Sequence, residues 1–230
     1  MRAAVVVLAA GAGTRVGAEV NKVLLPLAGV PVVSRSVRTA LAVPGVHRVV
    51  LVVRDGEQEA VRAAVEPWLD PHGPGVAMVS GGPTRHASEW QALSLLADDI
   101  EAGEIDVVAM HDAARPLSTE SLYARVLHEA ATHGGAIPVA SLDHLVDLDG
   151  AAVPDRLVGV QTPRAFRASD LLAAHRAARA DGFEATDTAG CLAAYRDVAV
   201  VAVESDVGNL KLTVADDFVV AARQVALSAG

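Results

Sequence analysis

A glycine-rich segment near the N-terminus carries residue types that suit phosphate binding. It consists of residues 9–15, Ala9-Ala10-Gly11-Ala12-Gly13-Thr14-Arg15. Small residues and glycines let backbone N–H groups approach a phosphate or a nucleobase closely. The glycines alone would fit an ordinary tight turn equally well. Arg15 and then Lys22 add two cations beside them, and this combination favours a triphosphate site.

The glycine spacing argues against two other phosphate-binding motifs. Gly11, Gly13 and Gly17 give G-x-G-x-x-x-G instead of the dinucleotide pattern G-x-G-x-x-G. The acidic residue expected about 20 residues later is missing, since Asp55 comes much further along. No Gly-Lys-Ser/Thr follows, which excludes a Walker loop. A nicotinamide-dependent dehydrogenase is therefore a weaker hypothesis.

Asp112 belongs to a second segment, His111-Asp112-Ala113-Ala114-Arg115-Pro116, which directly follows a predicted strand at 107–110. Ligands of open α/β sheets bind beyond the carboxyl ends of the strands. A carboxylate there can hold Mg²⁺ while substrate phosphates supply further ligands. The alternative is a turn residue paired with Arg115.

Two further segments contain candidate ligand-binding residues. Residues 81–88 run from a strand end into a helix, where Arg85 and Ser88 share one face of the first turn. They could recognise a base or a ribose, or simply belong to a helix cap. Lys211 lies between apolar neighbours, and an inward lysine needs an anion. The remaining histidines lack metal-ligand spacing, and no nucleophile set is recognisable, so we expect no covalent intermediate.

The overall charge limits the possible partners. The chain has 19 basic and 28 acidic residues, a formal net charge of −9, and only two of the basic residues are lysines. Without a polybasic stretch, a nucleic-acid or anionic-membrane surface is not expected. Cys191 is the single cysteine, which suits a reducing cytosol. No apolar run approaches the roughly 18 to 20 residues of a membrane span, and no signal peptide is recognisable. We therefore expect a soluble, cytoplasmic protein.

Short apolar runs alternate with segments of helical period, which predicts an α/β protein with a mostly parallel sheet covered by helices. Strands are predicted at 3–9, 49–53, 76–79, 107–110, 136–139 and 198–203. Helices are predicted at 32–42, 57–68, 84–96, 119–131, 169–180 and 186–195. A last helix is predicted from Thr213, whose hydroxyl and Asp216 three residues later resemble a capping box. We expect one domain over residues 1–230, with a hairpin or arm at about 140–160.

Four segments, in this order, resemble the 2-C-methyl-D-erythritol 4-phosphate cytidylyltransferase family of the non-mevalonate isoprenoid pathway. They are AAGAGTR from Ala9, GGPTRHAS from Gly81, HDAARP from His111 and NLKLT from Asn209, and Gln161-Thr162-Pro163 and Thr186-Asp187 also match. The resemblance covers essentially the whole chain. It implies a Rossmann-like nucleotidyltransferase fold with helices on both sheet faces and a protruding β-arm. That arm would be exchanged between the subunits of a homodimer.

The resemblance also implies the reaction and the site residues. CMP would pass from CTP to a small polyol phosphate with release of pyrophosphate, and Mg²⁺ would be the cofactor. The catalytic cations would be Arg15, Lys22 and Lys211, and Asp112 would bind Mg²⁺. The nucleotide-binding residues would be Ala9, Ala10, Gly11, Ala12, Gly13, Gly82, Arg85, Ser88 and Ala113. The acceptor-binding residues would be Asp112, Thr162, Thr186 and Asp187, with Arg156 from the neighbouring subunit.

Departures from the family pattern cluster on the acceptor side. The stretch from Gly150 to Gln161 is short, so Arg156 can take the place of the family's arm arginine only if the loop is shifted in its alignment with the family. The other departures are Asn21 for proline, Leu142 for threonine, His144 for lysine, Arg164 for glutamine and Gly208 for an acidic residue. Two alternatives therefore stay open, a cytidylyltransferase for another polyol phosphate such as ribitol 5-phosphate, and a non-catalytic nucleotide-binding paralogue. The sequence ends at Gly230, soon after the last predicted helix, so we expect no fused downstream enzyme.

Overall fold

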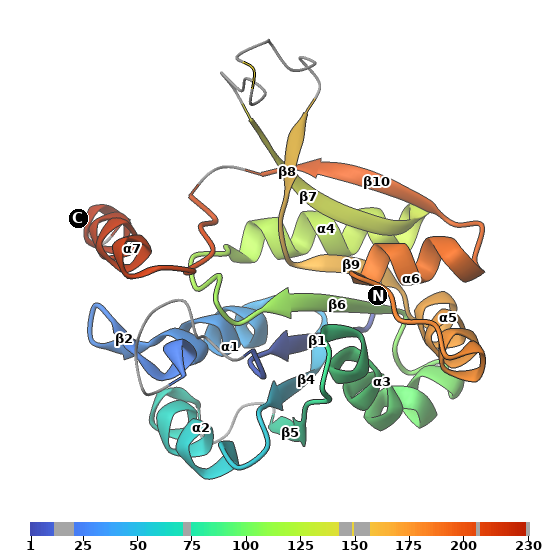
Figure 1. Cartoon of the computed structure of the whole chain (residues 1–230), viewed down its shortest axis with the longest axis horizontal. Helices are drawn as coiled ribbons and strands as arrows, with labels where there is room; N and C mark the ends of the chain where they lie inside the picture. The colour runs from blue at the N-terminus through green and yellow to red at the C-terminus, as the bar shows by residue number, and fades with distance from the viewer. Residues whose placement is uncertain (12–20, 71–74, 143–148, 150–156, 206–207, 229–230) are drawn as a thin grey trace.

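A computed structural model describes residues 1–11, 21–70, 75–142, 149, 157–205 and 208–228. Four of the predicted site residues, Ala12, Gly13, Arg15 and Arg156, lie outside this part of the chain. The described strands form one eight-stranded sheet and a small two-stranded one (Figure 1). The large sheet has the order β10-β7-β9-β6-β1-β4-β5, and β8 pairs with β7.

The six predicted strands all form, with small differences at their ends. They are β1 (Ala3–Leu8), β4 (Val46–Val53), β5 (Val76–Ser80), β6 (Val107–Asp112), β7 (Gly134–Ser141) and β10 (Ala199–Glu204). β1 pairs in parallel with β4 and β6, β4 with β5, and β10 with β7. The predicted mostly parallel sheet is therefore confirmed.

The remaining strands pair antiparallel with their neighbours. Apart from the arm at about 140–160, the periodicity of the sequence did not predict them. β9 (Arg164–Arg167) lies between β6 and β7 and runs antiparallel to both. It has arginine at both ends and only Ala165 and Phe166 between them, so it lacks the apolar run of a buried strand. β2 (Pro26–Leu27) and β3 (Val30–Pro31) form the small hairpin.

Helices cover both faces of the large sheet, as predicted. α1 (Val32–Ala42), α2 (Gln58–Val65), α4 (Glu120–His133) and α7 (Ala215–Ser228) pack into one hydrophobic core. α3 (Arg85–Glu101), α5 (Ala168–Asp181) and α6 (Thr188–Tyr195) pack into the other. Along β1, Val5 and Val7 face the first core, whereas Ala4 and Val6 face the second. This two-sided burial explains the unbroken apolar run.

Two short 3-10 helices complete the described elements, η2 (Lys22–Leu24) and η3 (Glu66–Trp68). The start of α7 differs from the prediction, because the cap is not made by Asp216. Asp217 Oδ2 instead accepts hydrogen bonds from the backbone N–H groups of Thr213 and Val214. α7 begins at Ala215, so the third helical residue, which reaches back to the cap, is Asp217.

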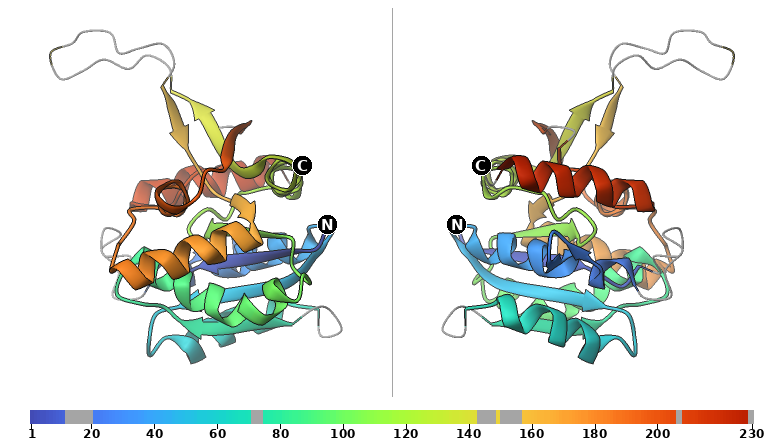
Figure 2. Two further views of the ribbon diagram at one scale, coloured as in Figure 1. Left: turned by 90° about the vertical axis from the view of Figure 1, so that its right-hand side faces the viewer. Right: turned by 90° about the vertical axis from the view of Figure 1, so that its left-hand side faces the viewer.

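Two paired strands form the base of the predicted arm. β8 (Val158–Val160) pairs antiparallel with the end of β7, with Ser141 opposite Val158 and Val139 opposite Val160. The side views show this pair projecting from the body of the molecule (Figure 2). Residues 143–148 and 150–156, including His144 and Arg156, lie outside the described residues. Within the described part, no helix combines the length and apolar character needed to cross a membrane.

Candidate active site

A cleft of about 420 Å³ lies beyond the carboxyl ends of β1, β5 and β6. Leu8 and Asp112, the last residues of β1 and β6, are partners in the sheet register. Three of the predicted segments therefore meet at one sheet edge, and Lys211 joins them from the chain before α7. The described lining residues are Leu8, Ala9, Ala10, Gly11, Lys22, Val23, Gly82, Pro83, Thr84, Arg85, Ser88, Asp112, Ala114 and Lys211.

Asp112 sits between two cations on the floor of this cleft. Its Oδ1 contacts the Arg85 guanidinium, and its Oδ2 accepts a hydrogen bond from Lys211 Nζ at 2.7 Å. Burial by itself would raise the pKa of Asp112, but the charges of Arg85 and Lys211 outweigh it and hold that pKa well below its usual range. Arg115, the partner expected for a plain turn residue, donates instead to the Asn209 carbonyl at 2.6 Å. Asp112 is therefore an ionised carboxylate facing the cleft.

Arg85 is held by a second carboxylate that the sequence analysis missed. Its Nε lies 3.0 Å from Oε1 of Glu89, a side chain with 1% exposure. Thr188 Oγ1, at the start of α6, donates to the same oxygen at 2.7 Å. An acidic residue four positions after an arginine in a helix was the available signal. The guanidinium is thus fixed between Glu89 and Asp112 and is oriented by α3 and β6 together.

The glycine-rich segment continues from β1 and is anchored by Asn21. Ala9 N–H donates to the Val52 carbonyl at 2.7 Å. Asn21 Nδ2 donates to the Ala9 carbonyl at 3.3 Å, while its Oδ1 accepts from Val23 N–H and so caps η2. η2 begins at Lys22, so asparagine at this position fixes the chain that carries the lysine. This gives the departure from the family's proline a structural role.

The double glycine after β5 is required by close packing. A Cβ on Gly81 would lie 2.6 Å from Ala10 Cβ and 2.9 Å from Ser88 Oγ. Ser88, which is 5% exposed, uses its hydroxyl to accept from Gly82 N–H at 3.1 Å. The segments 9–11 and 81–88 therefore form one wall of the cleft. Ala113 lies behind it, fully buried, with its N–H bonded to the Leu8 carbonyl.

Thr162 supports the floor of the cleft from below. It is 3% exposed, and its Oγ1 accepts from Asp112 N–H at 3.0 Å and lies 3.3 Å from His111 Nδ1. Burial lowers the pKa of His111 to about 4, so its imidazole is neutral at ordinary pH. Asn209 Nδ2 donates to the Thr162 carbonyl at 2.9 Å. This chain of hydrogen bonds ties β6 to the segment that carries Lys211.

The other predicted acceptor residues lie at the start of α6. Asp187 caps this helix by accepting from Gly190 N–H at 2.8 Å, and its Oδ2 lies 2.6 Å from Arg164 Nη1. Burial would raise the pKa of Asp187, but the Gly190 N–H and Arg164 lower it overall. Thr186 is exposed next to it. Neither Thr186 nor Asp187 is among the residues that line the cleft.

The donor set of the cleft fits a magnesium ion. Among the described lining residues, Asp112 is the only carboxylate. An ionised carboxylate offers about four lone-pair positions, and Arg85 and Lys211 each use one oxygen. Mg²⁺ commonly takes one or two protein carboxylates and completes its shell with substrate phosphates and water.

The chain is similar to known proteins over nearly its whole length. The family model for 2-C-methyl-D-erythritol 4-phosphate cytidylyltransferase matches residues 3–226. The chain is 41% identical over 222 residues to an enzyme of that name from Symbiobacterium thermophilum, covering 93% of this chain and 89% of the relative. The crystal structure of the enzyme from Thermus thermophilus is similar, with 28% identity, a TM-score of 0.74 and coverage of 98% and 100%. 4-Diphosphocytidyl-2C-methyl-D-erythritol synthase from Anaerococcus prevotii, at 22% identity, shares the fold with a TM-score of 0.80 and coverage of 98% and 96%.

Proposed function

Because the chain belongs to the 2-C-methyl-D-erythritol 4-phosphate cytidylyltransferase family, we propose that the cleft beyond β1, β5 and β6 is the site of its reaction. The enzyme transfers CMP from CTP to 2-C-methyl-D-erythritol 4-phosphate and releases pyrophosphate. The observation that carries the assignment of the site is the ionised Asp112 between Arg85 and Lys211, beside a glycine-rich wall.

The reaction needs positioning and charge neutralisation more than covalent chemistry. An oxygen of the acceptor phosphate forms a bond to the α-phosphorus of CTP, and the bond to the pyrophosphate oxygen breaks. We propose that Arg15 and Lys22 hold the triphosphate and that Lys211 neutralises charge at the α-phosphoryl group. Both lysines line the cleft, which supports this role. In a chain of net charge −9, these cations create a local attraction for phosphate.

The walls of the cleft supply the nucleotide contacts. The backbone of Ala9, Ala10 and Gly11, continuing to Ala12 and Gly13, would approach the nucleotide from one side. Gly82, Arg85 and Ser88 would contact cytidine from the adjoining part of the same wall, as their place in the lining of the cleft supports. Ala113 would act through the main chain, since its side chain is buried. Arg85 is held by two carboxylates, so its guanidinium would present its remaining N–H groups to the nucleotide in a fixed orientation.

Magnesium is the proposed cofactor, and Asp112 would hold it. Bound there together with substrate phosphates, the ion would offset the negative charge that develops during transfer. Asp112 can take this part at any ordinary pH because the pKa of its carboxyl lies far below 7.

The acceptor side and the arm complete the proposal. Thr186 and Asp187 would bind the polyol, and Thr162 would act by holding Asp112. The chain would form one domain and a cytoplasmic homodimer, in which the arm at about 140–160 brings Arg156 to the neighbouring subunit. Exposed apolar side chains at the base of the arm, Leu142, Leu157, Val158 and Val160, support burial against a second subunit.

An assay of pyrophosphate release tests the proposal. We expect release with CTP, Mg²⁺ and 2-C-methyl-D-erythritol 4-phosphate, and at least a hundredfold less with ribitol 5-phosphate as the matched acceptor. Lys22→Ala should weaken CTP binding and abolish turnover. Turnover with ribitol 5-phosphate and none with 2-C-methyl-D-erythritol 4-phosphate would contradict the proposed identity of the acceptor. Unchanged CTP affinity in Lys22→Ala, together with no release of pyrophosphate from CTP in the presence of either acceptor, would identify a non-catalytic paralogue.

A further inference from the structure

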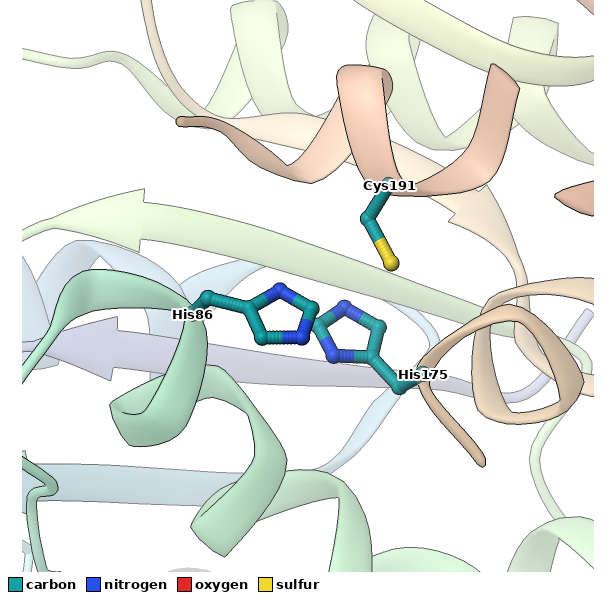
Figure 3. A group of neighbouring side chains, drawn as sticks. All are labelled: His86, His175 and Cys191. Atoms are coloured by element: carbon teal, nitrogen blue, oxygen red, sulfur yellow. The ribbon is translucent and has the colours of Figure 1, made fainter. Parts of the chain in front are cut away.

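Three helices bring together a buried cluster of metal-binding side chains outside the cleft. His86 of α3, His175 of α5 and Cys191 of α6 place their nitrogen and sulfur atoms within 4.8 Å of one another (Figure 3). The exposed fractions of these side chains are 8%, 0% and 0%. The three residues are far apart in the sequence and have no metal-ligand spacing there, so only the packing of the helices brings them together.

The polar atoms of this cluster are left without hydrogen bonds. Within the described part of the chain, no partner is found for His86 Nδ1 or for either ring nitrogen of His175. Oε2 of Glu89 is also unpartnered, and it lies 3.6 Å from His175 Nε2. Each buried polar group without a partner costs about 1–3 kcal/mol. A bound ion could take a lone pair from one nitrogen of each ring and from Glu89 Oε2, while the second nitrogen of His175 carries the ring proton.

The types of the side chains and the closeness of their ligand atoms favour a metal ion as the ligand. The two imidazoles stack with centroids 4.5 Å apart and an interplanar angle of 10°. Figure 3 shows one nitrogen of each ring on the side from which the Cys191 sulfur approaches. In a tetrahedral zinc site neighbouring ligand atoms are roughly 3.5 Å apart, so the two rings would turn out of their parallel stack for both lone pairs to point at one ion.

We propose that His86, His175 and Cys191, with Glu89 as the fourth ligand, form a closed structural site for a zinc ion. Imidazole and thiolate ligands select a borderline or soft ion of this kind, whereas Mg²⁺ requires oxygen ligands. The Cys191 thiol gives its proton to solvent as the sulfur–zinc bond forms. The thiolate and the Glu89 carboxylate then balance the two positive charges of the ion, so the buried site stays neutral.

The surroundings provide access and a connection to the active site. A hollow of about 190 Å³, lined by His86, His175 and Trp90 among others, gives an entry path from the surface. Glu89 uses its other carboxylate oxygen to hold Arg85, which contacts Asp112. An ion at this site would therefore join α3, α5 and α6 and keep Arg85 in position.

Metal analysis of the full chain, purified without a histidine tag or metal-affinity column, tests the proposal. After chelation and incubation with excess Zn²⁺, followed by desalting, we expect one zinc per chain. Zn²⁺ at about 100 times its Kd should raise the Tm of the metal-free protein by roughly 5–10 °C. With Co²⁺ in place of Zn²⁺, a thiolate-to-cobalt charge-transfer band should appear.

Three variants locate the ion. Cys191→Ala should lose the zinc, the Tm rise and the cobalt band, while its metal-free Tm shows that it folds. His128→Gln, at an exposed histidine of α4, should keep all three. Asp112→Asn should also keep the zinc, which separates this site from the magnesium site. Less than a tenth of a zinc per chain without a cobalt band, or equal zinc in Cys191→Ala, would overturn the proposal.

Discussion

Lys211 Nζ lies 2.7 Å from Asp112 Oδ2, across 99 residues of sequence. The pair places an ammonium group at the cleft and keeps the carboxylate ionised. Lys22 lines the same cleft, so both lysines of the chain are found there. The remaining positive charge of the protein is carried by arginines. The amino acid type at these two positions should therefore matter as well as the charge.

Lys22→Arg and Lys211→Arg should each lower kcat by about 10²-fold at unchanged net charge. Lysine is a compact point charge, whereas the planar guanidinium is larger, and displacing a catalytic group by about 1 Å costs this much. Steady-state pyrophosphate release measures the effect, with the exposed exchange Arg62→Lys as the charge-conserving control. Near-normal rates in both variants would remove the special role of lysine.

Thr162→Val should lower kcat and reduce the free energy of unfolding by about 1–3 kcal/mol, because Asp112 N–H would be left buried and unpaired. Thr162→Ser keeps the hydroxyl and should restore both quantities. Chemical denaturation and turnover are measured on the same preparations. If serine behaves like valine, the hydroxyl is not what positions Asp112.

Gly81→Ala should raise the KM for CTP about tenfold or more, since the added Cβ would push against Ala10 and Ser88 in the wall of the cleft. Gly75→Ala is the matched control, because a Cβ there meets nothing within 4 Å and its φ is not positive. Initial rates over a range of CTP concentrations measure the difference. Equal KM values in the two variants would show that this wall does not contact the nucleotide.

Asp187→Asn should raise the KM for the acceptor about tenfold while the KM for CTP changes little. Asparagine caps a helix as well as aspartate does, so this variant keeps the bond to Gly190 N–H but removes the charge and the ion pair with Arg164. Asp187→Ala should show the same acceptor defect and lose about 1 kcal/mol more stability. An unchanged acceptor KM in both variants would exclude Asp187 from the polyol site.

The stability of the chelator-treated protein should fall as the pH drops from about 6.5 to 4. Burial lowers the pKa of His111 to about 4 and that of His175 to about 3. Between the unfolded and folded pKa values the unfolded chain binds more protons, so acid favours unfolding, by about 1.4 kcal/mol per pH unit for each histidine.

His111→Gln should flatten this dependence, since glutamine does not titrate, and His128→Gln at an exposed position should leave it unchanged. Urea unfolding at a series of pH values measures the slope. A slope in His111→Gln equal to that of the unaltered protein would contradict a neutral, buried His111.

Local patterns in the sequence were enough to predict the strands and helices that frame the site. Apolar runs without polar alternation marked β1 and β6, because those strands are buried on both faces. β9 was missed because Arg164 and Arg167 interrupt its apolar pattern. The cap of α7 was misplaced by one residue, because the helix begins at Ala215 and its third residue is therefore Asp217 and not Asp216.

The sequence by itself determined the family, the order of elements and the segments that reach the cleft, because these depend on residues close together in the chain. Only the tertiary structure decided that Asp112 pairs with Arg85 and Lys211 instead of Arg115. It alone brought His86, His175 and Cys191 together from three helices. Such contacts join residues far apart in sequence, and their partners are chosen by how the helices pack on the sheet. No local pattern records that choice.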